Sequence, residues 1–194
     1  MVGFTGQHNE SDHSAVSVRV ADLADASAIA AVHVAGWEGA YRGMVPHAEI
    51  NRRTVAWRTE MWEAILQATV DGSRPWVAVA ERDGPIIGFV SMGAPRGADR
   101  DGSEARGQGV ARRTLEITGL YVTPTAWRHG AGTALMRAAL AEASARGCDD
   151  VTLWVLEPND RARVFYERFG FSDDGARQRD GEGWPVELRM RRSI

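Results

Sequence analysis

The sequence predicts one α/β (α+β) domain, built as a mixed β-sheet with helices on both faces. Three observations lead to this fold class. A strand-like segment over 115–122 runs through a glycine-rich turn into a helix with a continuous apolar face. A second apolar segment, 151–156, follows that helix, as in a β-α-β unit with parallel strands. Shorter strand and helix signals, including a hairpin pattern, flank this unit on both sides.

Length and composition set the outer limits. A chain of 194 residues suits one domain and buries about 70% of its unfolded surface. The net charge of −3 does not indicate the excess of positive charge that binding to nucleic acid or an anionic membrane requires. All 23 basic residues are arginine, so no lysine is present to form a Schiff base. The single cysteine, Cys148, and the lack of a signal pattern or of an apolar run of about 20 residues predict a cytoplasmic protein with no membrane partner.

The first elements follow from local patterns. Residues 1–15 are rich in Gly, His, Ser and Asp, which predicts a flexible tail before a domain over 16–194. Alternation over 16–20 predicts a strand, and Asp22 with Asp25 predicts a capped helix start. The apolar face of that helix is expected to contain Ile29, Val32, Gly36, Trp37, Ala40 and Tyr41.

The next segment reads as a helix followed by a hairpin. Periodicity predicts one helix from Pro46 to about Ala68, with charged side chains on a solvated face, among them Arg52, Arg53 and Arg58. Strands over 75–81 and 86–92, joined through an Asp-Gly turn, predict a hairpin. Residues 93–113 have many glycines and charges without periodicity, which is typical of a long surface loop.

The turn after the 115–122 strand has the chemistry of a phosphate receptor. Its glycines, Gly130 and Gly132, open a helix whose first N–H groups lie unpaired at the positive end of a dipole. Paired glycines at a helix start more often mark only a tight turn. The P-loop is excluded because it requires lysine, and a dinucleotide fingerprint requires a third glycine.

The C-terminal part carries a second, shorter helix. Residues 157–160 cap it, and Gly170 ends it with Phe171 packing back. Its apolar positions are Ala162, Phe165, Tyr166 and Phe169. Strands near Phe171 and over 185–190 complete the predicted sheet.

Two motifs in this order resemble the GNAT superfamily of acetyl-CoA-dependent N-acetyltransferases. The first consists of Leu120, Tyr121, Val122, Pro124, Trp127, Arg128, Gly130, Gly132 and Leu135. The second consists of Asn159, Ala162, Phe165, Tyr166, Glu167, Gly170 and Phe171. The resemblance implies a single domain with a mostly antiparallel central sheet, acetyl-CoA as the cosubstrate, and no metal. The family usually has Gln or Arg where this chain has Trp127, and we expect that difference to change packing more than cofactor binding.

The resemblance also implies a cofactor site. Backbone groups of three residues on the central strand would pair with the pantetheine arm, namely Leu120, Tyr121 and Val122. The turn would hold the pyrophosphate through Arg128, His129, Gly130, Ala131, Gly132 and Thr133. Asn159 matches a position that contacts the cofactor or fixes the loop.

The catalytic residues implied by the resemblance are Tyr166 and Glu116. Tyr166 matches the family's general acid, although an apolar-face tyrosine of a short helix would look the same. By alternation, Glu116 lies on the same face as Thr118, Leu120 and Val122, where it is either the general base or a solvated gatekeeper. Water is a further candidate for the base.

Substrate choice is expected to lie outside these motifs. Trp37, Glu38 and Tyr41 resemble a segment that borders the acceptor cleft in many small-amine enzymes of the family, which favours a small cationic amine as acceptor. Acetylation of a protein or peptide N-terminus is the alternative, but Trp154 stands where that branch has its basic Glu. A non-catalytic acyl-CoA-binding module and a plain interaction protein also remain open. Dimers occur in the family, so a homodimer is compatible with the resemblance.

Overall fold

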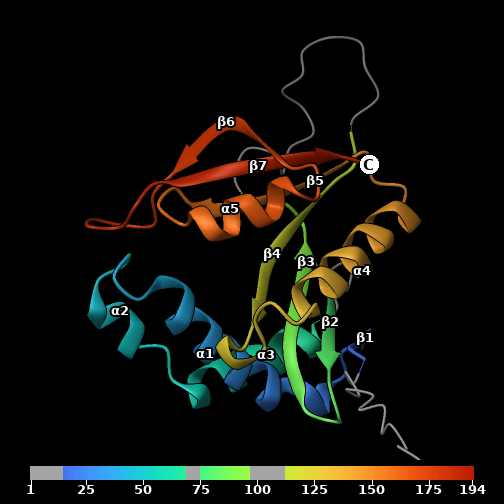
Figure 1. Cartoon of the computed structure of the whole chain (residues 1–194), viewed down its shortest axis with the longest axis vertical. Coiled ribbons are helices and arrows are strands. Elements are labelled where there is room, and N and C mark those ends of the chain that lie inside the picture. Colours follow the sequence, from blue (N-terminus) through green and yellow to red (C-terminus); the bar gives the residue numbers. More distant parts are fainter. Residues whose placement is uncertain (1–14, 69–74, 97–111) are drawn as a thin grey trace, which may run out of the picture.

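A computed structural model describes residues 15–68, 75–96 and 112–194 of the chain (Figure 1). Within these ranges, seven strands form one sheet in the order β1-β2-β3-β4-β5-β7-β6. The strands are β1 Ser17–Val20, β2 Trp76–Glu81, β3 Ile86–Gly93, β4 Thr114–Val122, β5 Asp150–Leu156, β6 Ser172–Gln178 and β7 Glu187–Ser193. Only β4 and β5 pair in parallel, and the other neighbours are antiparallel. The predicted mixed, mostly antiparallel sheet is therefore confirmed.

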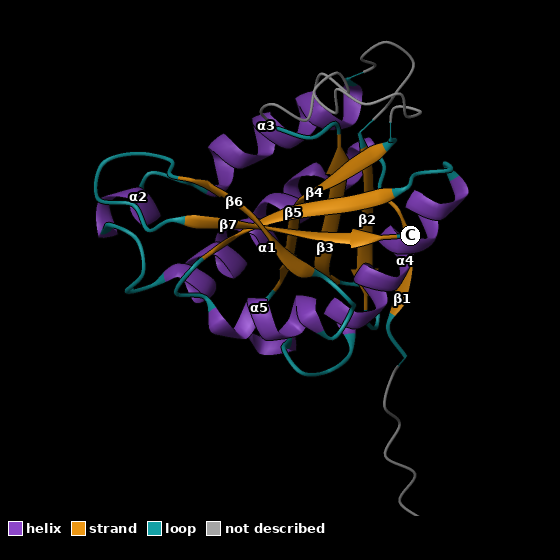
Figure 2. Cartoon of the chain, turned by 90° about the horizontal axis from the view of Figure 1, so that it is seen from above, coloured by secondary structure: helices purple, strands orange, loops and turns teal. Residues whose placement is uncertain are grey.

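Helices cover both faces of the sheet (Figure 2). They are α1 Ala26–Tyr41, α2 His47–Asn51, α3 Val55–Gln67, α4 Ala131–Ala145 and α5 Asp160–Glu167, with short 3-10 turns η1 Leu23–Asp25 and η3 Pro124–Ala126. One apolar cluster joins α1 and α3 to β2 and β3. A larger cluster joins α4 and the apolar side of α5 to the opposite face. None of the described helices combines the length and the apolar character that crossing a bilayer requires.

The start of α1 is fixed by charge and capping. Asp22 and Asp25 form the predicted capping box. The Asp22 side chain accepts backbone N–H groups of the first turn, and the Asp25 side chain accepts the backbone N–H of Asp22. Arg19 of β1 donates to Asp25 at 2.6 Å and to Glu81 at 2.7 Å. These contacts tie the edge of the sheet to the first turn that precedes α1.

The predicted single helix over 46–68 is wrong, because the structure has two helices there. Thr54 stands between them in an extended conformation, and its hydroxyl accepts the N–H of Trp57 at 3.3 Å. A threonine side chain that caps a helix competes with the backbone bonds that would continue the preceding one. The hairpin of β2 and β3 is confirmed. The predicted tail, apart from Ala15, and most of the predicted 93–113 loop lie outside the described residues.

The centre of the sheet opens between β4 and β5. The two strands pair only from Thr114 to Ile117, opposite Asp150 to Leu153. Beyond that point β4 continues along β3, whereas β5 continues along β7, and the strands diverge (Figure 1). The backbone of the last part of β4 is therefore left without a strand on the β5 side.

A β-bulge at Thr118 changes which face each β4 residue occupies. Ser91 pairs with Gly119 and the next residue of β3 pairs with Ile117, so Thr118 is an extra residue. Ile117 before the bulge and Leu120 after it both pack in the α4-side cluster. Glu116 therefore lies on the opposite face from Leu120 and Val122, and the prediction that they share a face is wrong. Simple alternation fails here because one inserted residue reverses the parity of the strand.

Candidate active site

The turn before α4 has the backbone geometry of an anion receptor. Arg128 and Gly130 both have positive φ, 65° and 89°, and Gly130 is the N-cap of α4. The first backbone bond into the helix is the N–H of Ala134 to the carbonyl of Gly130, at 2.9 Å. In the described part of the chain, the preceding amides of residues 131–133 have no acceptor. Free amides at a helix N-terminus, where the dipole is positive, suit a phosphate group.

Two arginines from other elements contact this turn, which itself contains Arg128. Arg161 of α5 stacks on the ring of Trp127, with its guanidinium carbon 3.6 Å from the ring centroid. Arg82 donates to the carbonyl of His129 at 2.7 Å, and its Nε is buried without a partner. Burial lowers the pKa of Arg161, and the charge of Arg128 lowers it further. Positive charges that repel one another around free amides fit a diphosphate.

Trp127, which stands where the GNAT pattern usually has Gln or Arg, makes its own contacts with the turn. Its indole Nε1 donates to the carbonyl of Val122 at 2.8 Å, and its ring supports Arg161. The tryptophan thereby anchors the turn to the end of β4 through packing. Sequence reasoning missed Arg82 and Arg161, since they come from distant segments and belong to no motif.

A cavity of about 340 Å³ lies between the end of α1 and the start of α5. Its lining consists of Gly39, Ala40, Arg42, Met44, Pro158, Asn159, Asp160 and Arg161. Asn159 is buried, and its side-chain oxygen accepts the N–H of Ala162 at 3.2 Å, which caps α5. The cavity shares Arg161 with the turn before α4, so it continues the same site.

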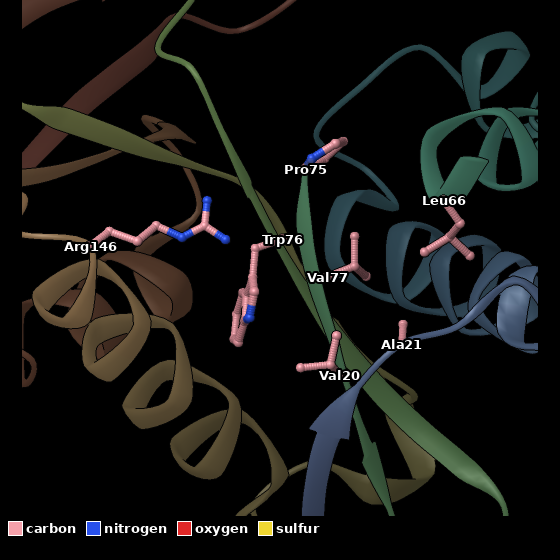
Figure 3. A pocket seen from close by; sticks show the side chains of 7 residues that line it. All are labelled: Val20, Ala21, Leu66, Pro75, Trp76, Val77 and Arg146. Carbon is pink, nitrogen blue, oxygen red and sulfur yellow. The ribbon is translucent and has the colours of Figure 1, made fainter. Parts of the chain in front are cut away.

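A second hollow, of about 230 Å³, lies near Arg146 at the opposite end of α4 from the anion-receiving turn (Figure 3). Its lining consists of Val20, Ala21, Leu66, Pro75, Trp76, Val77 and Arg146. Arg146, the one charged member, is engaged with Glu142 at 2.7 Å. An apolar depression without converging polar groups offers no chemistry, so we assign no catalytic role to it.

The three tyrosines of the chain come from α1, β4 and α5 and lie near one another. The hydroxyls of Tyr41 on α1 and Tyr121 on β4 are 3.4 Å apart. Tyr166 on α5 packs edge-on against Phe165 and Phe171. Burial raises the pKa of Tyr166, and Tyr41 raises it further. Burial also raises the pKa of Tyr121 to about 12, so these hydroxyls are proton donors at neutral pH.

Two carboxyl groups lie on the face opposite α4. Glu116 is 1% exposed, and both of its oxygens accept bonds from Arg96, from Nε at 2.6 Å and from the backbone N–H at 2.9 Å. Glu187 on β7 accepts from Gln178 at 2.5 Å. Burial raises the pKa of Glu187, and the nearby charge of Glu116 adds to this. Sequence reasoning missed Glu187, because only the pairing of β7 with β5 brings it to this face.

Of the predicted acceptor-binding residues, Trp37 and Tyr41 come together and Glu38 does not join them. The rings of Trp37 and Tyr41 are 4.4 Å apart, and Trp184 lies 6.2 Å from Trp37. Glu38 instead forms an ion pair with Arg42 one turn later, where Arg42 is largely exposed and Glu38 about half exposed. An aromatic corner is thus present without the carboxylate expected in it.

Metal ligation has no support in the described side chains, which include no group of three or more His, Cys, Asp or Glu residues placed to hold an ion. The residues do fit coenzyme A. Free amides before α4, the arginines Arg82, Arg128 and Arg161, and the open edge of β4 match a diphosphate joined to an extended amide chain.

Comparisons with known proteins agree with this geometry. Residues 40–171 match the Acetyltransferase (GNAT) family. An uncharacterized N-acetyltransferase of Mycobacterium tuberculosis is 31% identical over 164 residues, covering 84% of this chain and 83% of that protein. The PaiA N-acetyltransferase of Thermoplasma acidophilum, solved with coenzyme A, has a TM-score of 0.70 at 17% identity over 93% of this chain and 99% of that one. YncA of Salmonella typhimurium, solved with its cofactor acetyl-CoA, has a TM-score of 0.61 at 22% identity over 93% and 94%.

The solved structures show the likeness of fold, and the family match spans more than half of the sequence. The chain belongs to the GNAT family and is an acetyl-CoA-dependent N-acetyltransferase.

Proposed function

We propose that the protein moves an acetyl group from acetyl-CoA to the primary amine of a small molecule by direct attack in a ternary complex. The observation that carries this proposal is the meeting of two features at the β4–β5 opening. The anion-receiving turn before α4 follows the end of β4, and the protonated Tyr166 of α5 lies near Tyr41 and near Tyr121 of β4. A thioester bound along β4 would pass from one to the other.

The cofactor contacts follow from this placement. The amides of residues 128–133 hold the diphosphate, with Arg128 and Arg161 beside it. The backbone over 120–122, which lacks a neighbour on the β5 side, pairs with the amides of the pantetheine arm. Asn159 acts indirectly, because its cap fixes the start of the helix that carries Tyr166.

The reaction needs one group that removes a proton and one that supplies a proton. Acetyl-CoA supplies a thioester whose C–S bond breaks as the amine nitrogen forms a C–N bond to the carbonyl carbon. Glu116, oriented by Arg96, takes the amine proton directly or through water. A backbone N–H near Val122 stabilises the oxyanion, and Tyr166 gives its proton to the departing sulfur.

A small cationic amine is the acceptor class that the charges support. Glu116 and Glu187 lie on one face of the opening and attract an ammonium group, the role first expected of Glu38. Aromatic rings of Trp37, Tyr41 and Trp184 border the same side. The acceptor nitrogen would then transfer its proton to Glu116, directly or through water, before it attacks the thioester.

The test is a screen of acetyl-CoA consumption with polyamines, aminoglycosides, amino acids and peptides. We expect one class of small amines to be acetylated and both Tyr166→Phe and Glu116→Gln to lower kcat by about a hundredfold or more. Each variant should still bind coenzyme A, because neither side chain belongs to the diphosphate site. Thermal shift with coenzyme A is the matched control for folding and binding. Unchanged kcat in Tyr166→Phe would remove the acid role.

A further inference from the structure

Arg58 on α3 is a buried charge without a counterion. The residue is 8% exposed, although its position predicted a solvated face. Its Nη1 contacts only the sulfur of Met61 at 3.2 Å, its guanidinium lies 4.9 Å from the ring of Trp57, and its Nε is buried without a partner. No carboxylate of the described chain forms an ion pair with it. An arginine cannot lose its charge in a protein, so this arrangement costs stability until an anion arrives.

Arg53 lies nearby and is also incompletely paired. Its guanidinium carbon is 4.5 Å from the ring of Trp37 and 5.5 Å from that of Trp184. Nη1 donates to the carbonyl of Glu49 at 2.7 Å and to its carboxylate at 3.1 Å. Among the described residues, its Nε and Nη2 have no acceptor, and the indole Nε1 of Trp37 is buried and unpaired. These N–H donors therefore have no acceptor within the described part of the chain.

The neighbours of the two arginines are neutral. Burial lowers the pKa of His33 to about 3, and the charges of Arg58 and Arg53 lower it further. Tyr121 stays protonated, since burial raises its pKa to about 12. The imidazole and the phenol therefore do not balance the two positive charges at neutral pH.

The arginines adjoin the proposed acceptor site. Trp37, which stacks on Arg53, is 4.4 Å from Tyr41, and the hydroxyl of Tyr41 is 3.4 Å from that of Tyr121. Arg53 is 21% exposed at its side chain, so solvent reaches this member of the pair. The face of Trp37 that would hold a cationic amine is already occupied by Arg53.

We propose that Arg53 and Arg58 form an anion subsite that binds a carboxylate of the acceptor, so that the acceptor is an amine carrying a carboxylate, as in an amino acid. This inference rests on the proposed function and deepens it. Guanidinium groups bind a planar carboxylate through paired N–H donors, and the indoles shield that contact from water. The acceptor then has its carboxylate at the arginines and its ammonium group near Glu116 and Glu187, which matches the separation of charge in the site.

Matched acceptors test the proposal. For each of several amino acids, acetyl transfer is compared among the acid, its carboxamide and the decarboxylated amine. We expect kcat/KM to fall at least about tenfold when the carboxylate is removed, as for the loss of a charge-assisted contact. Arg53→Gln and Arg58→Met should abolish that preference. Arg52→Gln is the control, because Arg52 also pairs with Glu49 but is 75% exposed, and the preference should persist in it.

Thermal unfolding separates a binding role from a structural one. Arg58→Met keeps most of the buried stem and removes an unpaired charge, so the melting temperature should rise while the carboxylate preference disappears. A lower melting temperature together with an unchanged preference would mean that Arg58 serves the fold only, and it would overturn the proposal.

Product binding makes the test independent of turnover. The protein saturated with coenzyme A is titrated calorimetrically with N-acetyl amino acids and their amides. Tighter binding of the acids, lost in Arg58→Met, supports the subsite. Equal binding of acid and amide, or preference for phosphorylated amines in the transfer assay, overturns the carboxylate assignment while acetyl transfer itself stands. Absence of transfer to any amine would instead overturn the proposed function.

Discussion

At the scale of single residues, the interior of the α1–α3 side is built around one neutral histidine. His33 is 8% exposed and accepts the indole N–H of Trp62 at 3.2 Å. Its ring is 4.7 Å from that of Tyr121 and 5.2 Å from that of Phe89. Burial lowers the pKa of this imidazole, and the charges of Arg58 and Arg53 lower it further, so His33 stays uncharged at neutral pH.

His33 should make the protein sensitive to acid. The pKa of His33 is about 3 in the folded protein and about 6.5 in the unfolded chain. Between these values the unfolded chain binds a proton at His33 and the folded protein does not. This stabilisation is complete above pH 6.5 and is lost toward pH 3, at up to about 1.4 kcal/mol per pH unit. His33→Gln, which retains an acceptor for Trp62, should lack this slope. Urea unfolding at pH 7, 5.5 and 4 measures the free energy of unfolding at each pH. The same pH dependence in the wild-type protein and in His33→Gln would contradict the assignment.

Single residues also show which parts of the site could be predicted from the sequence and which could not. Tyr166 and Asn159 were predicted through the family resemblance, because the motif that contains them lies within one short segment of the chain. Glu187 and Arg58 were not, because their burial depends on pairing and packing between segments far apart in the chain. A charged residue in a helical pattern is predicted to face solvent, because the sequence does not show which neighbouring helix packs over it.

At the scale of elements, the turn before α4 depends on left-handed backbone. A Cβ at Gly130 would meet nothing within 4 Å, so the barrier to a side chain there is conformational, not steric crowding. Gly175 in β6 has the same character, with φ of 91° and open space around it. The two glycines provide a matched pair with different distances from the site.

Gly130→Ala and Gly175→Ala should therefore cost similar stability, about 1–2 kcal/mol each. Only Gly130→Ala should weaken coenzyme A, because it moves the amides that point at the diphosphate. Chemical denaturation gives the first quantity and calorimetric titration with coenzyme A the second. Equal coenzyme A affinity in both variants would show that the turn does not hold the phosphates.

The order of the elements was predictable, whereas two of their details were not. The strand, turn and helix over 115–146 carry strong local signals: glycines, an apolar face and a Thr-Pro corner. The break between helices at Thr54 and the bulge at Thr118 do not have signals of this strength in the sequence. The bulge is stabilised by a contact between strands, the 2.8 Å bond between Ser91 and Thr118, which no single segment encodes.

At the scale of the whole molecule, the sheet consists of two parts joined at one end. Asp150, 2% exposed, sits at the closed end and binds Arg112 at 2.7 Å, Arg191 at 3.4 Å and the hydroxyl of Ser193 at 2.9 Å. Beyond the four paired residues of β4 and β5, the parts separate. Ion pairs thus connect the strands at one end, and beyond the paired residues β4 and β5 are not joined.

The central claim is that the turn before α4 grips the diphosphate of coenzyme A and so places its sulfur beside Tyr166. A crystal structure of the complex with coenzyme A tests this most directly. We predict phosphate oxygens within hydrogen-bond distance of the amides over 128–133, and the sulfur within reach of the Tyr166 hydroxyl. Diphosphate bound elsewhere, or a sulfur directed away from Tyr166, would contradict the account.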